Sequence, residues 1–314
     1  MIKAPISVLI PTMNRPESLQ KKIESYLHGD VLPSQIVIVD QSNDEDLKIK
    51  VQNIATSYNT TTTITYIWLN EPALTKARNM AIKVASEEIL IVSDDDVLVN
   101  KDTLSNVVNT MRDEKISLIA GLSHKHDKKT KKSSLVSYLV GAKSFCKRKK
   151  GHVTLSLLGR YPQIIKGHVE TEYAMGYFFV IRKSLLDKWG INWDEKLTGY
   201  AYPEDLDFSY AYYKKSKIEG LKCILSEDIV VEHCVSTEYR TPSRKSAFMM
   251  VVNRLYLSYK HNMGLKSRLA MRWYNFWLYI KWKMNKQDAK DLKDAIIFAR
   301  KYRKDIKNGI LFYD

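Results

Sequence analysis

The chain has 314 residues, 45% hydrophobic and 27% charged, which is the composition of a folded globular protein and excludes a disordered or fibrous one. No segment approaches the ~18 uninterrupted apolar residues of a membrane span, and residues 1–17 lack the pattern of a signal peptide. We therefore expect a cytoplasmic protein, either free or peripheral on the inner face of the cell membrane. The cysteines Cys146, Cys223 and Cys234 have no metal-binding spacing and form no even set, so we expect each to be a small buried residue in a reducing compartment.

Positive charge is concentrated near the C-terminal end of the sequence. Residues 241–314 contain 17 Lys or Arg and 5 Asp or Glu, so +12 of the net charge of +15 lies in this segment. A basic segment attracts phosphate-rich partners, which are nucleic acids or anionic membrane surfaces. The charge alone does not choose between them.

The first hundred residues alternate between strand and helix patterns. Short apolar runs predict strands over 6–10, 36–39, 62–69 and 88–92, and apolar positions at helical spacing predict helices over 15–27 and 75–86. Such alternation is typical of an α/β fold with a parallel, doubly wound sheet and crossover helices.

The rest of the chain has a less regular pattern. Charged residues over 124–132 and 147–150 predict loops on either side of a helical hairpin. Residues 228–232 have a strand-like pattern, and from Ser243 onward the pattern is helical, with a break at Gly264.

Polar side chains follow three of the predicted strands, where ligands bind in sheets of this type. Thr12 and Asn14 follow the first strand, Asp40 the second, and Asp94-Asp95-Asp96 the fourth. Three adjacent carboxylates repel one another, so they suit a hard divalent cation, Mg²⁺ or Mn²⁺, completed by a substrate diphosphate. A solvated acidic turn is the alternative for this triplet, and a simple turn residue is the alternative for Asp40.

A second acidic region lies near residue 200. Glu204 and Asp205 follow a stretch rich in Gly, Pro and aromatic residues, which suits a substrate-binding loop, although either residue could instead cap the helix that begins there. His233 follows a predicted strand and could complete a metal site, contact a phosphate or be structural.

Taken together, these stretches resemble the family 2 glycosyltransferases, which have the GT-A fold. The matching stretches occur in the family's order between about residues 5 and 235: SVLIPTMNRPESLQ, IVIVDQSNDE, ALTKARNMAIKVASEEILIVSDDDVLV, MGYFFVIRKSLL, WDEKLTGYAYPEDLDFSYAYYKK and VVEHCV. The resemblance implies a GT-A catalytic domain over 1–240, with a nucleotide-sugar half over about 1–100 and an acceptor half over about 101–240. Residues 241–314 then form a basic, aromatic-rich helical extension.

The resemblance also implies roles for individual residues. The implied donor-binding residues are Pro11, Thr12, Asn14, Arg15, Asp40, Arg78, Asn79, Asp94 and Asp95. Among them, Asp40 contacts the uracil or ribose and Arg78 lies near the phosphates. Asp94 and Asp96 are the outer members of a DxD motif, and Asp96, Asp94 and His233 form the site for Mn²⁺ or Mg²⁺. Asp205 is the catalytic base, and Glu204 orients donor or acceptor groups.

The expected reaction is inverting transfer of one sugar from a nucleotide diphosphate, with a UDP-sugar favoured, to an acceptor hydroxyl. The implied acceptor is a glycan or lipid-linked glycan in capsule or other surface-polysaccharide synthesis. The Gln-x-x-Arg-Trp motif of processive members is absent from the sequence. A metal-dependent nucleotidyltransferase is an alternative, although PTMNRPES lacks the glycines of a phosphate loop. A basic nucleic-acid-binding protein is another, although no zinc-finger spacing or RNP-like signature is present.

The extension contains aromatic and aliphatic residues at helical spacing with basic neighbours. The apolar positions are Leu265, Leu269, Trp273, Phe276, Trp277, Ile280 and Met284. This pattern predicts a helix over about 265–284 that lies on an anionic membrane surface. Packing against the catalytic domain, or against another subunit of an oligomer, is an equally good interpretation.

Overall fold

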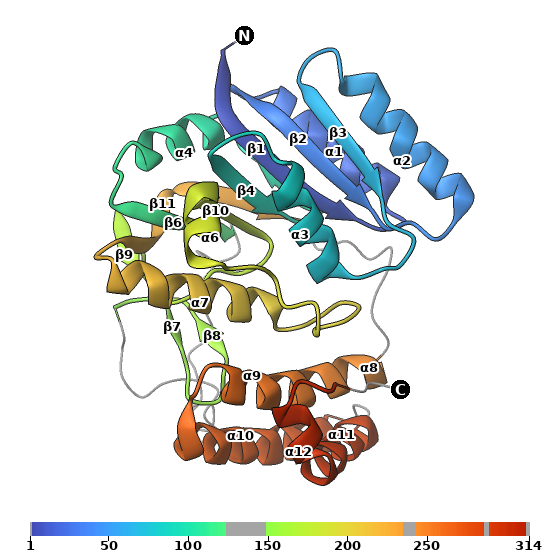
Figure 1. Cartoon of the computed structure of the whole chain (residues 1–314), viewed down its shortest axis with the longest axis vertical. Helices are drawn as coiled ribbons and strands as arrows, with labels where there is room; N and C mark the ends of the chain where they lie inside the picture. The colour runs from blue at the N-terminus through green and yellow to red at the C-terminus, as the bar shows by residue number, and fades with distance from the viewer. Residues whose placement is uncertain (1, 124–148, 235–242, 286–288, 312–314) are drawn as a thin grey trace.

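The computed structural model describes residues 2–123, 149–234, 243–285 and 289–311 (Figure 1). The predicted loop over 124–132, the helical hairpin after it and Cys146 lie outside the described residues.

The described elements have the following bounds. The strands are β1 Lys3–Thr12, β2 Leu32–Asp40, β3 Thr63–Trp68, β4 Ile89–Ser93, β5 Val97–Val99, β6 Ile116–Ser123, β7 His152–Val153, β8 Gly159–Arg160, β9 His168–Glu170, β10 Phe178–Arg182 and β11 Lys222–His233. The helices are α1 Pro16–Leu27, α2 Glu45–Tyr58, α3 Leu74–Val84, α4 Thr103–Met111, α6 Lys183–Trp189, α7 Glu204–Ile218, α8 Ser243–Phe248, α9 Arg254–Lys260, α10 Gly264–Met284, α11 Ala289–Lys301 and α12 Arg303–Lys307. A π-helical segment, Met249–Asn253, joins α8 to α9.

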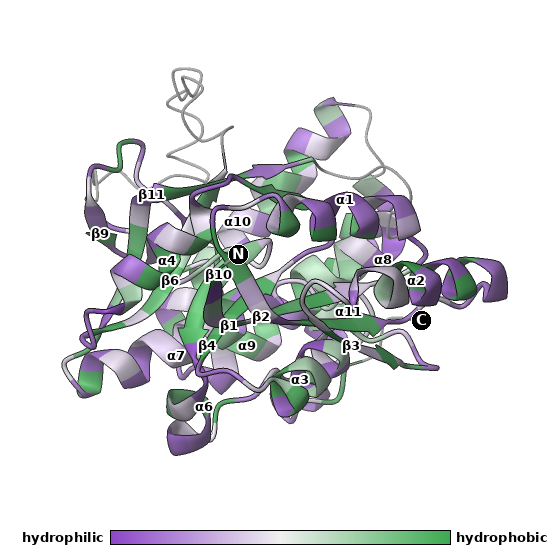
Figure 2. Cartoon of the chain, turned by 90° about the horizontal axis from the view of Figure 1, so that it is seen from above, coloured by the Kyte–Doolittle hydropathy of each residue, from purple (hydrophilic) through white to green (hydrophobic). Residues whose placement is uncertain are grey.

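The central sheet has the strand order β3-β2-β1-β4-β10-β6-β11-β5, and β9 pairs with β11. β1, β2, β3 and β4 are parallel, as are β6 and β11, whereas β10 runs antiparallel to both β4 and β6. This mostly parallel sheet confirms the predicted α/β class. Figure 2 shows its central strands coloured as hydrophobic, with helices of mixed hydropathy around them.

Several elements differ from the sequence prediction. Strands β5, β6 and β10 and helices α4 and α6 were not predicted, and β2 and α2 differ for identifiable physical reasons. β2 begins at Leu32, before the apolar run, because Ser34 and Gln35 satisfy their polar groups inside the sheet by bonding to the Ala4 carbonyl and the Ser7 hydroxyl. Helix α2 was not predicted because its buried face consists of only Val51 and Ala55, which gives a weak helical pattern.

The C-terminal helices form a separate group beneath α7, at the far end of the molecule from β1–β3 (Figure 1). They share an apolar core with the rest of the molecule, in which Phe248 and Leu257 are buried together with Leu206 of α7. The predicted break at Gly264 is confirmed: this residue has a φ of +75°, a left-handed conformation that glycine adopts freely, and it begins α10. None of the described helices has the length and apolar character needed to cross a bilayer.

The expectation for the cysteines is confirmed at one position and wrong at another. Cys223 lies buried in β11 against β6, whereas Cys234 is exposed. Cys234 comes after the last residue of β11, so its side chain lies beyond the packed interior, although its backbone N–H donates to the Asp96 carbonyl.

Candidate active site

The carboxyl ends of β1, β2 and β4 bring the predicted polar residues to one edge of the sheet. Thr12 and Asp40 are register partners at the ends of β1 and β2, and the aspartate triplet follows β4 directly. Thr12 also donates a hydrogen bond of 2.8 Å to Asp95. The sheet therefore joins residues that are about 80 positions apart in the sequence.

Asp95 is held toward the loop after β1. Its two carboxylate oxygens accept hydrogen bonds from Thr12 and, at 3.0 Å, from Arg15. Burial raises the pKa of Asp95 to about 6, while the Arg15 charge and the Thr12 hydrogen bond oppose the rise. In this arrangement Arg15 neutralises the middle carboxylate of the triplet and fixes its orientation.

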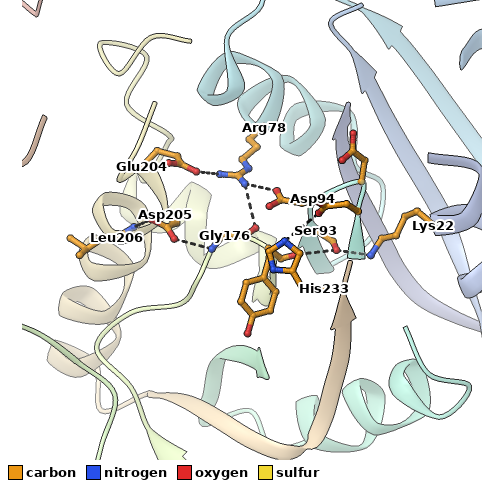
Figure 3. Close-up of polar contacts among 12 residues, drawn as sticks. Lys22, Arg78, Ser93, Asp94, Gly176, Glu204, Asp205, Leu206 and His233 are labelled. Carbon is orange, nitrogen blue, oxygen red and sulfur yellow. Dashed lines mark hydrogen bonds and ion pairs between the residues drawn. The ribbon is translucent and has the colours of Figure 1, made fainter. Parts of the chain in front are cut away.

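A buried arginine joins the two acidic regions. Arg78 is 1% exposed, and its guanidinium contacts Asp94 at 3.0 Å and Glu204 at 2.8 Å (Figure 3). The same group donates to the Gly176 carbonyl and lies 4.5 Å from the centre of the Trp193 ring. One cation thus holds the first aspartate of the triplet at a fixed position relative to the acid pair, even though 126 residues separate Arg78 from Glu204.

The acid pair lies in the first turn of α7. Asp205 accepts hydrogen bonds from the backbone N–H groups of Gly176, at 3.0 Å, and Leu206, at 2.7 Å (Figure 3). Burial raises the pKa of both Glu204 and Asp205, and the neighbouring Asp205 charge raises that of Glu204 further. The helix begins after Pro203, which makes no side-chain cap, so neither acid occupies the N-cap position that the sequence had left open.

Gly176 lies between Arg78 and Asp205, where a side chain would have little room. A Cβ atom added there would lie 3.2 Å from both the Arg78 guanidinium and the Asp205 Cβ. Gly176 and Trp193 lie in stretches that carry the family resemblance, but neither was predicted to be a site residue.

Asp96 and His233 form the third part of the site. Asp96 Oδ1 lies 3.4 Å from His233 Nε2, and the imidazole stacks on Tyr177 with 5.1 Å between the ring centres. No group of three His, Cys, Asp or Glu side chains able to hold a metal ion occurs in the described residues. Two converging protein donors fit an ion whose remaining ligands are substrate phosphate and water, a common arrangement for Mg²⁺.

A lysine missed in the sequence lies beneath the triplet. Lys22 of α1 is fully buried, and its ammonium donates a hydrogen bond of 2.7 Å to Ser93, the last residue of β4. Burial lowers the pKa of Lys22 to about 7, and the charges of the three aspartates oppose this shift. When it is protonated, the lysine places a positive charge behind the carboxylates and favours their ionised form.

Other predicted donor-binding residues have their side chains engaged within the protein. Asp40 is fully buried and accepts hydrogen bonds from the Ser42 backbone and hydroxyl and from Tyr66. Asn14 bonds across to Asn43, which joins the loops after β1 and β2, and Pro11 lies within β1.

Asn79 contacts the loop before α7. Its side chain exchanges hydrogen bonds with the Trp193 backbone and donates to Glu195. It therefore lies beside the Trp193 loop that covers Arg78, while the contact partners of Asp94 are Arg78 and the Tyr177 backbone.

Comparisons with known proteins identify a family for this chain and several structures with a similar fold. The family described as Glycosyl transferase family 2 matches residues 7–190, more than half of the chain. Among curated proteins, no sequence matches this chain.

Several solved structures have a similar fold. A mannosyltransferase from Pyrobaculum calidifontis, PcManGT in complex with GDP-Man and Mn²⁺, is 16% identical, with a TM-score of 0.54 over 97% of this chain and 84% of its own. TarS 1–349 of S. aureus in complex with UDP-GlcNAc is 18% identical, with a TM-score of 0.51 over 88% of this chain and 72% of its own. GalNAc-T7 with UDP, GalNAc and Mn²⁺ is 16% identical, with a TM-score of 0.56 over 94% of this chain and 56% of its own. These likenesses show the GT-A fold, and the family match shows that the chain belongs to glycosyl transferase family 2 and that its function is glycosyl transfer.

Proposed function

We propose that the chain moves one sugar from a nucleotide-diphosphate donor to an acceptor hydroxyl, with inversion at the anomeric carbon. The observation that supports this most directly is the bridge from Asp94 through Arg78 to Glu204. It sets the acid pair at a fixed distance from the triplet, so that one region can hold the diphosphate while the other meets the acceptor.

Asp205 is the proposed catalytic base. An acceptor hydroxyl is a poor nucleophile at neutral pH, and a carboxylate within hydrogen-bond reach can accept its proton as the new bond forms. The raised pKa of Asp205 makes its carboxylate a better proton acceptor than an exposed aspartate. With a single base and no covalent intermediate, the anomeric configuration inverts.

Glu204 and Arg78 act together in this proposal. The ion pair keeps Glu204 directed at Arg78, so Glu204 positions donor or acceptor groups and leaves the proton transfer to Asp205. Arg78 has to remain within reach of both Asp94 and the departing diphosphate, whose charge it would help to neutralise.

Asp96 and His233, with Asp94 beside them, would hold Mn²⁺ or Mg²⁺ together with the donor diphosphate. The ion supplies Lewis-acid stabilisation of the charge on the leaving group. The two protein donors and their 3.4 Å separation support such a substrate-completed site.

The substrates are proposed from the fold and family. A UDP-sugar is the favoured donor, with Asp40 near the base or ribose, and a glycan or lipid-linked glycan of a surface polysaccharide is the favoured acceptor. A peripheral position on the inner membrane face would suit that acceptor.

A donor screen tests the proposal. The protein is mixed with individual UDP-, GDP- and other nucleotide sugars, and the release of nucleoside diphosphate is measured with and without Mn²⁺. Release from at least one sugar nucleotide is expected. Release of pyrophosphate from a nucleoside triphosphate and a sugar phosphate, with none from any sugar nucleotide, would instead identify a nucleotidyltransferase.

A further inference from the structure

A cavity of about 250 Å³ lies among the C-terminal helices, in a part of the molecule that the proposed chemistry does not use. It is formed mainly by α10 and α11, with contributions from α9, α12 and the π-helical segment. Its apolar lining includes Val251, Leu255, Met271 and Ile296. An apolar interior of this kind suits hydrocarbon.

The lining of this cavity also carries a high positive charge. The cations that line it are Arg268, Arg272, Lys293, Arg300 and Arg303, and no Asp or Glu is among the described residues that line it. α10 contains no acidic residue over its 21 positions. On α11, Asp291 and Asp294 pair with Arg244 of α8, and neither of them lines the cavity.

An aromatic ring organises two of the cations. The Arg268 guanidinium lies 4.9 Å from the centre of the Tyr259 ring, and Arg303 donates a hydrogen bond to the Tyr259 hydroxyl. Arg268 Nε is buried and has no hydrogen-bond acceptor among the described residues. A buried donor without an acceptor is costly, so an anionic ligand that accepts from Arg268 would stabilise the site.

An exposed apolar face adjoins the cavity along α10. Leu265, Leu269, Trp273 and Phe276 follow one another at helical spacing, and each is at least half exposed. Phe276 belongs both to this face and to the cavity lining. The opposite face of α10 packs against the other helices through residues such as Met271 and Asn275. The helix is therefore held in place on one face and exposes apolar side chains on the other.

We propose that this cavity binds one anionic phospholipid and that the exposed face of α10 lies on the membrane that supplies it. The cations hold the lipid phosphate, and the cavity interior covers the first part of an acyl chain. Amphipathic anions match both features, whereas free phosphate would leave the apolar lining exposed to water. Two copies packed face to face through this surface would bring their cation clusters together, which disfavours a second copy as the occupant. The site does not depend on the identity of the transferred sugar.

Vesicle binding by the full-length protein tests the surface. Neutral phosphatidylcholine vesicles are compared with vesicles that contain 30 mol% phosphatidylglycerol, and bound protein is separated by flotation. The variant Arg272→Glu/Arg300→Glu is compared with Lys50→Glu/Lys83→Glu, which makes the same change in net charge on exposed residues of α2 and α3. Because each basic residue near an anionic surface contributes about fivefold, we expect the first variant to bind at least roughly thirtyfold more weakly and the control to bind like the wild type.

A soluble lipid tests the cavity itself. Dihexanoyl phosphatidylglycerol, below its micelle concentration, should bind in titration calorimetry, whereas glycerol phosphate and dihexanoyl phosphatidylcholine should bind at least tenfold more weakly. Ala299→Leu, which fills part of the cavity and leaves its cations in place, should abolish binding without lowering the melting temperature. If that variant does not fold, the lipid titration is carried out instead with Arg272→Glu/Arg300→Glu and with the control Lys50→Glu/Lys83→Glu.

Four outcomes would overturn the proposal. The first is equal binding to neutral and anionic vesicles, and the second is equal loss in both charge-reversal variants. The third is dimerisation through α10 in light scattering without lipid. The fourth is binding of single-stranded RNA that depends on Arg272 and Arg300, together with no binding to anionic vesicles.

Discussion

Replacing Asp205 by Asn separates its proposed role as a base from its role in the fold. Both carboxylate oxygens accept a backbone hydrogen bond, one from Gly176 and one from Leu206. Asn has a single acceptor oxygen, so one of the two N–H groups loses its partner, at a cost of about 1–3 kcal/mol. The neutral amide also removes a buried negative charge. Burial of that charge is unfavourable, as the raised pKa of Asp205 indicates, so its removal offsets part of the cost of the lost hydrogen bond.

The effect on transfer should be larger and of a different kind. Loss of a general base lowers the rate by at least on the order of a hundredfold, or about 2.7 kcal/mol in the activation barrier. Donor binding should change little, because Asp205 contacts neither Asp96 nor His233. The assay measures kcat and the Kd of the nucleoside diphosphate at a temperature where the variant is fully folded. The melting temperature of the variant is measured separately.

Asp207→Asn is the matched control on the same helix. Asp207 is buried and accepts from Lys260 and His261, so its replacement should lower the melting temperature while kcat per folded molecule stays near that of the wild type. An Asp205→Asn variant that keeps wild-type kcat would refute the assignment of Asp205 as the base, whatever its stability.

The remaining predictions concern the neighbouring groups. Gly176→Ala should lower kcat about tenfold with a small loss of stability, because its Cβ would shift Arg78 or Asp205 by a few tenths of an ångström; unchanged kinetics would show that this approach is not critical. Asp96→Ala should abolish transfer, and Mn²⁺ should bind the wild type weakly alone and more tightly with nucleoside diphosphate in calorimetry, because the protein supplies few ligands; full activity in excess EDTA would contradict this. Since the base acts when ionised and burial raises its pKa, kcat/KM should fall with decreasing pH at a pH clearly above the ordinary aspartate value of about 3.9, and a profile that stays flat to pH 4 would exclude the raised pKa. The buried Lys22 has a pKa lowered to about 7, so unfolding takes up a proton between pH 7 and about 10; wild-type stability should therefore rise with pH over this range relative to Lys22→Met, by at most about 1.36 kcal/mol per pH unit in urea melts, and parallel curves would argue that the lysine is not buried.

The parts of the site that could be predicted from the sequence are those that depend on the pattern of neighbouring residues. An apolar run that stops at a polar residue marks both a buried strand and its carboxyl end, which is why Thr12, Asp40 and the aspartate triplet could be placed together in advance. The acid pair was singled out because it follows a stretch rich in Gly, Pro and aromatic residues, and its role was implied by the family resemblance. These inferences need only a few neighbouring residues and the rule that parallel strands end at one edge.

The remaining parts depend on contacts between distant segments. Lys22 has the sequence context of an ordinary exposed helical lysine, and its burial follows only from the packing of α1 beneath β4. Gly176 acquires its importance because Arg78 and Asp205 approach it from two other elements. A single sequence contains no sign of either approach, since each brings together segments tens of residues apart.

Helix α9 lies between the acid-pair helix and the proposed lipid cavity. At its C-terminal end, Lys260 and the following His261 contact the buried Asp207 of α7 at 2.6 and 2.8 Å, three residues after the start of the acid-pair helix. On its other side, Leu255 lines the proposed lipid cavity and Tyr259 holds two of the cations at its edge. A lipid held there would therefore lie one helix away from α7. Separating the buried Asp207 from its partners would be costly, so α7 and α9 should move together. The position of α9 on a membrane would then set the orientation of the acid pair relative to that membrane.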